Sequence, residues 1–151
     1  MDAFIIQKTL HKDTILSKIF MGVFARDELP ISVSYPSCFI INNKPKNHPG
    51  EHWLAFYYDS NKVCYFFDSY GNNPEFYSLT SYIMNTSSSW YYNKKRLQGD
   101  SNYCGLYSML YLTFISRNKI KLFYDFFNEN FQNNDKKLSI LLDKYLLKAN
   151  I

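Results

Sequence analysis

Four side chains of the kinds used in nucleophilic catalysis occur along the chain in the order His52, Asp68, Gln98 and Cys104. A thiol next to an imidazole is readily converted to the thiolate, which is the nucleophilic form of cysteine. A carboxylate beside the other ring nitrogen stabilises the imidazolium, and a side-chain amide donates a hydrogen bond to an oxyanion. The set predicts acyl transfer by a cysteine nucleophile, without a metal ion, if folding brings the four groups together.

The nucleophile of this set would be Cys104, which follows the cap-like run Asp100-Ser101-Asn102 and opens a predicted apolar helix over 103–116. The positive end of a helix dipole lowers the pKa of a thiol placed there. Gly105 follows directly and lets a substrate backbone approach closely. Taken alone, the pattern favours an inert cysteine in the hydrophobic core, so the assignment depends on the partners of Cys104.

His52 and Asp68 occupy the two ends of a predicted β-hairpin. The aromatic-rich runs His52–Tyr58 and Val63–Phe67 are typical of strands, and the turn sequence Asp59–Lys62 joins them. In an antiparallel hairpin, the start of the first strand lies beside the end of the second. We therefore expect His52 and Asp68 to meet, although each separately suits an ordinary loop or turn.

Gln98 lies six residues before Cys104, across a predicted turn over 99–103. From there its amide would reach the carbonyl oxygen that Cys104 attacks, together with the backbone N–H of Cys104. The ordinary alternative is a polar residue that ends a strand.

The elements expected around these residues form an α+β fold. Further elements are predicted in this order: a helix over 8–20 ending near Gly22, a strand Ser37–Ile41, a helix from Asn73-Pro74 to about Met84, a strand Trp90–Leu97, and helices over 120–130 and 134–148. We expect a single domain, residues 1–151, with a small, mainly antiparallel mixed sheet packed by helices.

Composition narrows the class of protein. The chain has 46% hydrophobic residues and a net charge of +4, which is typical of a globular protein. Its three cysteines are widely spaced and suggest neither a disulfide framework nor a zinc site, which favours a reducing, intracellular setting. The N-terminus lacks the pattern of a signal peptide, and the apolar run over 106–115 is too short to cross a bilayer, so no membrane association is expected.

The basic run Lys94-Lys95-Arg96 is the only tight cluster of positive charge. Such a run usually lies on a solvated strand end or loop, and less often forms a surface for DNA.

The motifs His52-Trp53, Phe67-Asp68-Ser69-Tyr70-Gly71 and Gln98-x5-Cys104-Gly105 resemble those of the adenovirus-protease (adenain) and SUMO-protease superfamily. The resemblance runs from about Phe20 to Ile115, and its upstream part over 20–42 is more similar to the adenovirus branch. It implies the adenain-like fold, with a papain-like circular arrangement of the triad.

The resemblance also implies roles. Cys104 would be the nucleophile, His52 the base, Asp68 the group that holds His52, and Gln98 the donor in the oxyanion hole. The substrate-binding residues would be Trp53, Gly105, Gly50 and Glu51, with Trp53 walling a narrow channel for Gly-Gly or Gly-X-Gly segments.

Two departures from the adenovirus enzyme bear on mechanism and regulation. The adenovirus enzyme has Glu in the place of Asp68, but either carboxylate is able to orient a histidine. No cysteine occurs between Gly71 and Gln98, so a disulfide-tethered activating peptide is not expected. No cofactor is expected, and activation by DNA or by a non-covalent peptide is left open.

Three functions remain open. The first is a viral or virus-like maturation protease that cuts capsid or precursor proteins, acts as a monomer in the nucleus or cytoplasm of a host cell, and is packaged in the virion. The second is a protease that removes ubiquitin-like modifiers. The third is a non-catalytic module that binds protein or nucleic acid, and the complete catalytic set argues against it.

Overall fold

The computed structural model of the protein describes residues 1–47 and 52–145. Gly50 and Glu51, two of the predicted substrate-binding residues, lie outside the described residues.

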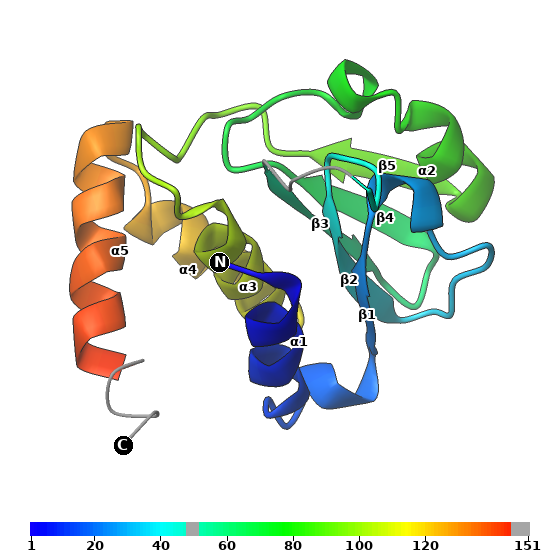
Figure 1. Cartoon of the computed structure of the whole chain (residues 1–151), viewed down its shortest axis with the longest axis horizontal. Helices are drawn as coiled ribbons and strands as arrows, with labels where there is room; N and C mark the ends of the chain where they lie inside the picture. Colours follow the sequence, from blue (N-terminus) through cyan, green and yellow to red (C-terminus); the bar gives the residue numbers. More distant parts are fainter. Residues whose placement is uncertain (48–51, 146–151) are drawn as a thin grey trace.

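A five-stranded mixed sheet forms the centre of the fold, with the strands in sequence order across the sheet (Figure 1). The strands are β1 (Phe20–Phe24), β2 (Ser37–Asn42), β3 (Trp53–Tyr58), β4 (Val63–Phe67) and β5 (Ser89–Tyr92). The central pairs β2–β3 and β3–β4 are antiparallel, and the outer pairs β1–β2 and β4–β5 are parallel. The predicted α+β class with a mixed sheet is confirmed.

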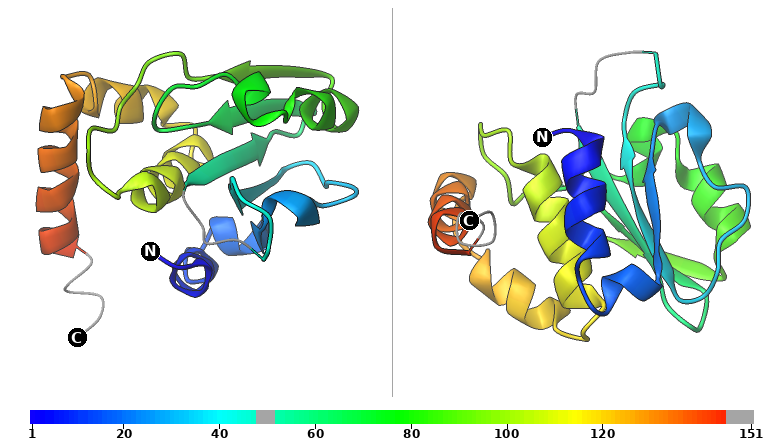
Figure 2. Two further views of the ribbon diagram at one scale, coloured as in Figure 1. Left: turned by 45° about the horizontal axis from the view of Figure 1, so that its top comes forward. Right: turned by 60° about the horizontal axis from the view of Figure 1, so that its bottom comes forward.

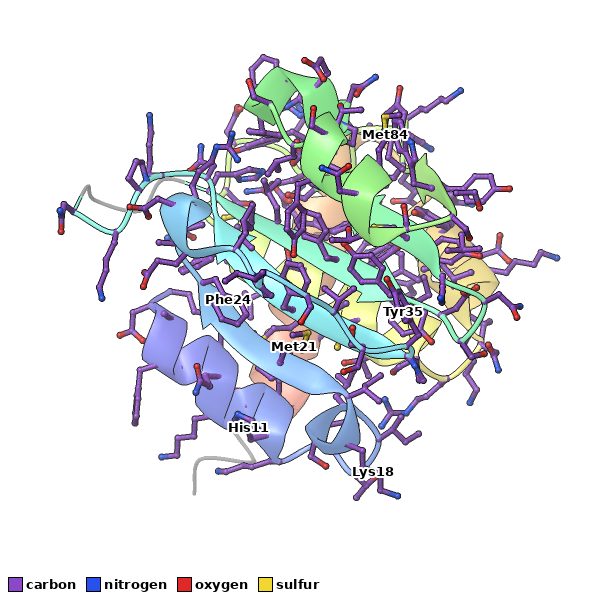
Figure 3. The ribbon with its side chains drawn as sticks, turned by 90° about the vertical axis from the view of Figure 1, so that its right-hand side faces the viewer. His11, Lys18, Met21, Phe24, Tyr35 and Met84 are labelled. Carbon is purple, nitrogen blue, oxygen red and sulfur yellow. The ribbon has the colours of Figure 1, made fainter. Side chains whose placement is uncertain are left out.

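Helices cover both faces of the sheet (Figures 1 and 2). On one face lie α1 (Ala3–His11), α3 (Cys104–Ile115) and α4 (Ile120–Phe126), with α5 (Phe131–Tyr145) flanking α3 and α4; α2 (Thr80–Thr86) covers the other. In the side view of Figure 3, His11 of α1 and Met84 of α2 accordingly lie on opposite sides of the sheet. None of the helices in residues 1–47 and 52–145 is long and apolar enough to cross a membrane.

The alternation of side chains along the strands produces two cores. In β3, Ala55 faces the cluster that contains α3, whereas Leu54 and Phe56 face the cluster that contains α2. The apolar α3 is almost wholly buried, as its sequence predicts, and Phe67 of β4 stacks on Tyr111 with ring centroids 4.3 Å apart. A helix held on all sides in this way keeps its N-terminus in a fixed position beside the sheet.

The predicted antiparallel hairpin is formed by β3 and β4, with Ala55 opposite Phe67. Its turn is closed by the Asp59 side chain, which accepts hydrogen bonds from the backbone N–H groups of Asn61 and Val63 at 2.9 Å each. The start of β3 therefore lies beside the end of β4.

The helix predicted over 8–20 is wrong in both bounds, because α1 spans Ala3–His11. Asp2 caps the first turn through the backbone N–H of Ile5, so α1 begins at Ala3. It stops at His11, because the Asp13 carboxylate accepts from the next free N–H groups and forms a turn. The chain then enters β1, an edge strand that the sequence analysis missed.

Three other predicted elements are shorter than expected. The helix predicted over 120–130 ends at Phe126, as α4. The helix predicted from Asn73 to about Met84 is a single 3₁₀ turn and a separate α2, divided by Ser78 in a left-handed conformation with φ of 56°. The strand predicted over 90–97 ends with β5 at Tyr92, because the Asn93 side chain turns to bind the backbone of Asp68.

Candidate active site

His52 and Asp68 form a buried pair, with 2.6 Å between His52 Nε2 and Asp68 Oδ1. His52 is 6% exposed and Asp68 is 0% exposed. The prediction that the hairpin brings these two side chains together is confirmed. Because Nε2 faces the carboxylate, Nδ1 is the ring nitrogen left for a reacting partner.

The Asp68 carboxylate is held by further donors. Tyr77 donates its hydroxyl to Oδ2 at 2.6 Å, and the backbone N–H of Tyr70 donates to Oδ1 at 2.9 Å. The Asn93 amide binds both backbone groups of Asp68, accepting from its N–H at 3.0 Å and donating to its carbonyl at 2.5 Å. These bonds fix the position from which the carboxylate meets the imidazole.

Cys104 lies at the first position of α3, where interaction with the His52 ring lowers the pKa of its thiol. The backbone of Trp53 and of Gly105 also lowers the pKa of this thiol. The helix is capped by Tyr103 without a side-chain hydrogen bond, so neither Ser101 nor Asn102 fills the N-cap position that the sequence suggests. The N–H groups of the first turn are therefore free to stabilise negative charge on the sulfur.

The pKa values of the three groups shift in the directions that an ion pair requires. Burial opposes protonation of His52, but the hydrogen bonds to Asp68 and Cys104 outweigh it and raise the pKa to about 9. Burial likewise opposes ionisation of Cys104 and Asp68, yet contacts with His52 lower the pKa of both groups. All three shifts favour the charged forms, which are the thiolate, the imidazolium and the carboxylate.

The Gln98 side chain is fully buried and has a fixed orientation. The Ser69 hydroxyl donates to Oε1 at 2.5 Å, and Nε2 donates to the carbonyl of Ser101 at 2.7 Å. An amide nitrogen carries two hydrogens, so one remains for a substrate oxygen. Gln98 and Cys104 border the same cavity.

A cavity of about 530 Å³ opens at the thiol. Its walls include the predicted site residues Trp53, Gln98 and Cys104. The other lining residues were not predicted to border the site: Met1, Asp2, Ala3, Asn42, Tyr70, Ser101 and Asn102. The Trp53 indole donates to the backbone carbonyl of Met1 at 3.1 Å, which places the N-terminal segment on the rim. Gly105 contacts the Trp53 wall so closely that a Cβ would lie 3.1 Å from Trp53 Cδ1.

Several side chains support the site although the sequence analysis assigned no role to them. Tyr70 stacks on His52 with ring centroids 4.6 Å apart, and Ser69 orients Gln98. These two could have been suspected, because they follow Asp68 directly. Tyr77 and Asn93 carry no local signal, since their roles depend on contacts across the fold.

The basic run is used partly within the protein. Lys95 donates to the carbonyl of Asn128 at 3.2 Å, and Arg96 donates to that of Gln98 at 2.6 Å. The three cysteines are all free. In the described part of the chain, no group of three or more His, Cys, Asp or Glu residues is arranged to hold a metal ion.

Comparison with known families gives one match. A family model described as adenovirus endoprotease matches residues 20–139, a range that covers most of the chain and includes His52, Asp68, Gln98 and Cys104. Comparison with curated proteins gives no match.

Proposed function

Because the chain belongs to the adenovirus endoprotease family and is therefore a cysteine protease, we propose that Cys104 is its nucleophile, His52 its general acid and base, and Asp68 the residue that orients His52. The observation that carries this assignment is the His52 ring, which lies between a buried carboxylate at 2.6 Å and the Cys104 thiol. A cavity large enough for an extended peptide opens on that thiol.

Acylation begins with attack of the Cys104 thiolate on the scissile carbonyl. The carbonyl oxygen becomes an oxyanion, which accepts hydrogen bonds from Gln98 Nε2 and from the backbone N–H of Cys104. The His52 imidazolium then donates its proton to the leaving amine, and the C–N bond breaks. Asp68 stabilises the charge on His52 before that transfer and keeps Nδ1 directed toward the sulfur.

Deacylation uses the same groups in reverse. Neutral His52 removes a proton from water, and the hydroxide attacks the thioester. The same donors stabilise the second oxyanion, and the carboxylic acid product leaves as the thiolate and imidazolium form again.

The shape of the site supports a substrate with small residues before the scissile bond. A Cβ on Gly105 would lie only 3.1 Å from Trp53 Cδ1, so little space remains beside Trp53 where it borders the cavity at Cys104. Glycine-rich segments of the Gly-Gly or Gly-X-Gly type would pass through this space. We propose that the physiological reaction is maturation cleavage of viral or virus-like precursor proteins.

The test compares purified wild-type protein with Cys104→Ala on three substrates: Gly-Gly peptides, Gly-X-Gly peptides and a modifier conjugate ending in Gly-Gly. We expect peptide cleavage by the wild type and none by Cys104→Ala, with the same melting temperature for both. The matched control is Cys38→Ala, because Cys38 is a buried cysteine whose pKa burial raises to about 12.

Three outcomes decide between the functions. Peptide cleavage that survives in Cys104→Ala would remove the assignment of the nucleophile. Efficient cleavage of the modifier conjugate with little action on the peptides would favour the deconjugating protease. Failure of the wild type to cleave any substrate, with and without added DNA, would support the non-catalytic module.

A further inference from the structure

We propose that Asp135, at the start of α5, is a positioning residue for the oxyanion hole: its carboxylate holds the loop that carries Gln98 in its working conformation. The proposal rests on the function proposed above and adds a residue that the catalytic set does not include. It concerns the segment over 93–103, which joins β5 to α3 and has no regular structure.

The loop passes between the sheet and the start of α5, as Figures 1 and 2 both show. On the sheet side, the backbone N–H groups of Leu97 and Gln98 both donate to the carbonyl of Ser69, at 2.8 and 3.0 Å. Ser69 follows Asp68 directly, so this side of the loop is tied to the end of β4. Asn93 and the Gln98 side chain also bind residues at the end of β4, but these bonds do not involve Gly99.

On the other side, Asp135 connects the loop to α3. Its Oδ2 accepts a hydrogen bond from the backbone N–H of Gly99 at 3.0 Å, and its Oδ1 accepts one from the Tyr107 hydroxyl at 2.8 Å. Gly99 is the residue after Gln98, and Tyr107 is one turn into the helix that Cys104 begins. The Asp135 carboxylate therefore holds the loop at Gln98 in place relative to the start of α3. The loop and the start of α3 supply the two proposed oxyanion donors.

The fit at Gly99 is close. A Cβ on Gly99 would lie 2.7 Å from Asp135 Oδ2 and 3.2 Å from the carbonyl oxygen of Phe131. A side chain there would push the loop away from α5. The absence of a side chain at this position is thus a condition for the hydrogen bond between Gly99 and Asp135.

Neighbouring contacts reinforce the same loop. The buried Asn134 donates to the carbonyl of Leu97 at 3.2 Å. Arg96 donates to the carbonyl of Gln98, and its guanidinium lies over the Phe131 ring of α5 at 4.4 Å. The start of α5 therefore contacts Arg96, Leu97 and Gly99, and Asn134 and Asp135 bind the two residues that flank Gln98.

Asp135 should affect stabilisation of the oxyanion but not activation of the Cys104 thiol. Its hydrogen bonds go to Gly99 and Tyr107, whereas the groups that lower the pKa of Cys104 are His52 and the backbone of Trp53 and Gly105. Small errors in the placement of a donor reduce the rate strongly, because the oxyanion hole must match the transition state. Loss of Asp135 should consequently slow acylation without slowing alkylation of the thiolate, which forms no oxyanion.

The experiment measures peptide hydrolysis and iodoacetamide alkylation of Cys104 in the full chain, for Asp135→Ala, Asp135→Glu and Gly99→Ala. We expect kcat for Asp135→Ala and Gly99→Ala to fall roughly tenfold to a hundredfold. KM, the alkylation rate and its pH profile should stay within about twofold of wild type, and Asp135→Glu should recover part of the loss. Asp125→Asn, which changes an exposed carboxylate of α4, is the matched control.

Gly99→Ala keeps the test decisive if Asp135→Ala fails to fold, because it breaks the same hydrogen bond from the other side. Equal losses of hydrolysis and alkylation in folded variants would overturn the proposal, as would an unchanged kcat. If wild-type protein neither hydrolyses peptides nor reacts at Cys104, the proposed function itself fails and this inference with it. If the wild type is active and the variants match it, the role proposed for Asp135 is wrong and the proposed function stands.

Discussion

The charge of Asp68 should govern the pH at which Cys104 becomes nucleophilic, and Asp68→Asn removes that charge while nearly preserving the shape of the side chain. A rise in the pKa of His52 from 6.5 to about 9 corresponds to about 3 kcal/mol in favour of the imidazolium, at about 1.36 kcal/mol per pKa unit. Burial acts against this rise, and the hydrogen bond to Asp68 is the largest contribution in its favour.

The expected direction follows from the coupling between the two groups. Without Asp68, His52 loses its proton at lower pH, and the Cys104 thiolate then lacks a positive partner. The pKa of Cys104 should therefore rise toward its ordinary value of 9.0. If half of the 3 kcal/mol is lost, the pKa of Cys104 rises by about one unit, and alkylation below that pKa falls by up to about tenfold. At about pH 10 the thiol is ionised in both proteins, so their rates should converge.

The assay is the rate of iodoacetamide alkylation between about pH 5 and pH 10, with the modified residue identified by mass spectrometry. Cys38 and Cys64 should not contribute, because both are fully buried and burial raises their pKa to about 12. The basic limb of peptide hydrolysis, near pH 9 in the wild type if it reports His52, should also move to lower pH.

The control for this experiment is Asp125→Asn, which makes the same change of charge on the exposed surface of α4. Identical alkylation profiles for wild type and a folded Asp68→Asn variant would refute the reasoning, since Asp68 would then have no electrostatic effect on the reacting pair.

Three further outcomes test the packing around the site. Asn93→Ala should lower the free energy of unfolding by about 1–3 kcal/mol in urea denaturation and also lower kcat, because both backbone groups of Asp68 lose a buried partner. Phe67→Ala, at a position 0% exposed, should cost about 3–5 kcal/mol in the same measurement. Burial opposes ionisation of Asp13, but backbone N–H groups and Arg117 lower its pKa below 3.8, so its stabilisation is present above that pH and is lost as pH falls. Asp13→Asn should lower the urea midpoint at neutral pH, and the difference from wild type should shrink below about pH 4; a constant difference would contradict this explanation.

Local sequence was sufficient to predict the hairpin, the buried helix and the pairing of His52 with Asp68. The turn residues over 59–62 make the hairpin a short-range structure, and a hairpin necessarily places the start of β3 beside the end of β4. An almost wholly apolar run predicts a buried helix wherever it packs. These features depend on residues close together in the chain, which is why the sequence pattern contains them.

Features that depend on distant contacts could not be read in this way. β1 is a parallel edge strand that exists through its pairing with β2, and its residues continue an apolar pattern that also suits a helix. The groups that brace the site come from separate elements: Asn93 after β5, Tyr77 before α2, and Asp135 on α5. These hydrogen bonds join residues that are 9, 25 and 36 positions apart, and single contacts of this kind leave no periodicity in the sequence. The identity and order of the reacting groups could therefore be predicted from the sequence. Their distances, burial and pKa shifts depend on the tertiary structure, because they arise only when the folded sheet and helices bring separate elements into contact.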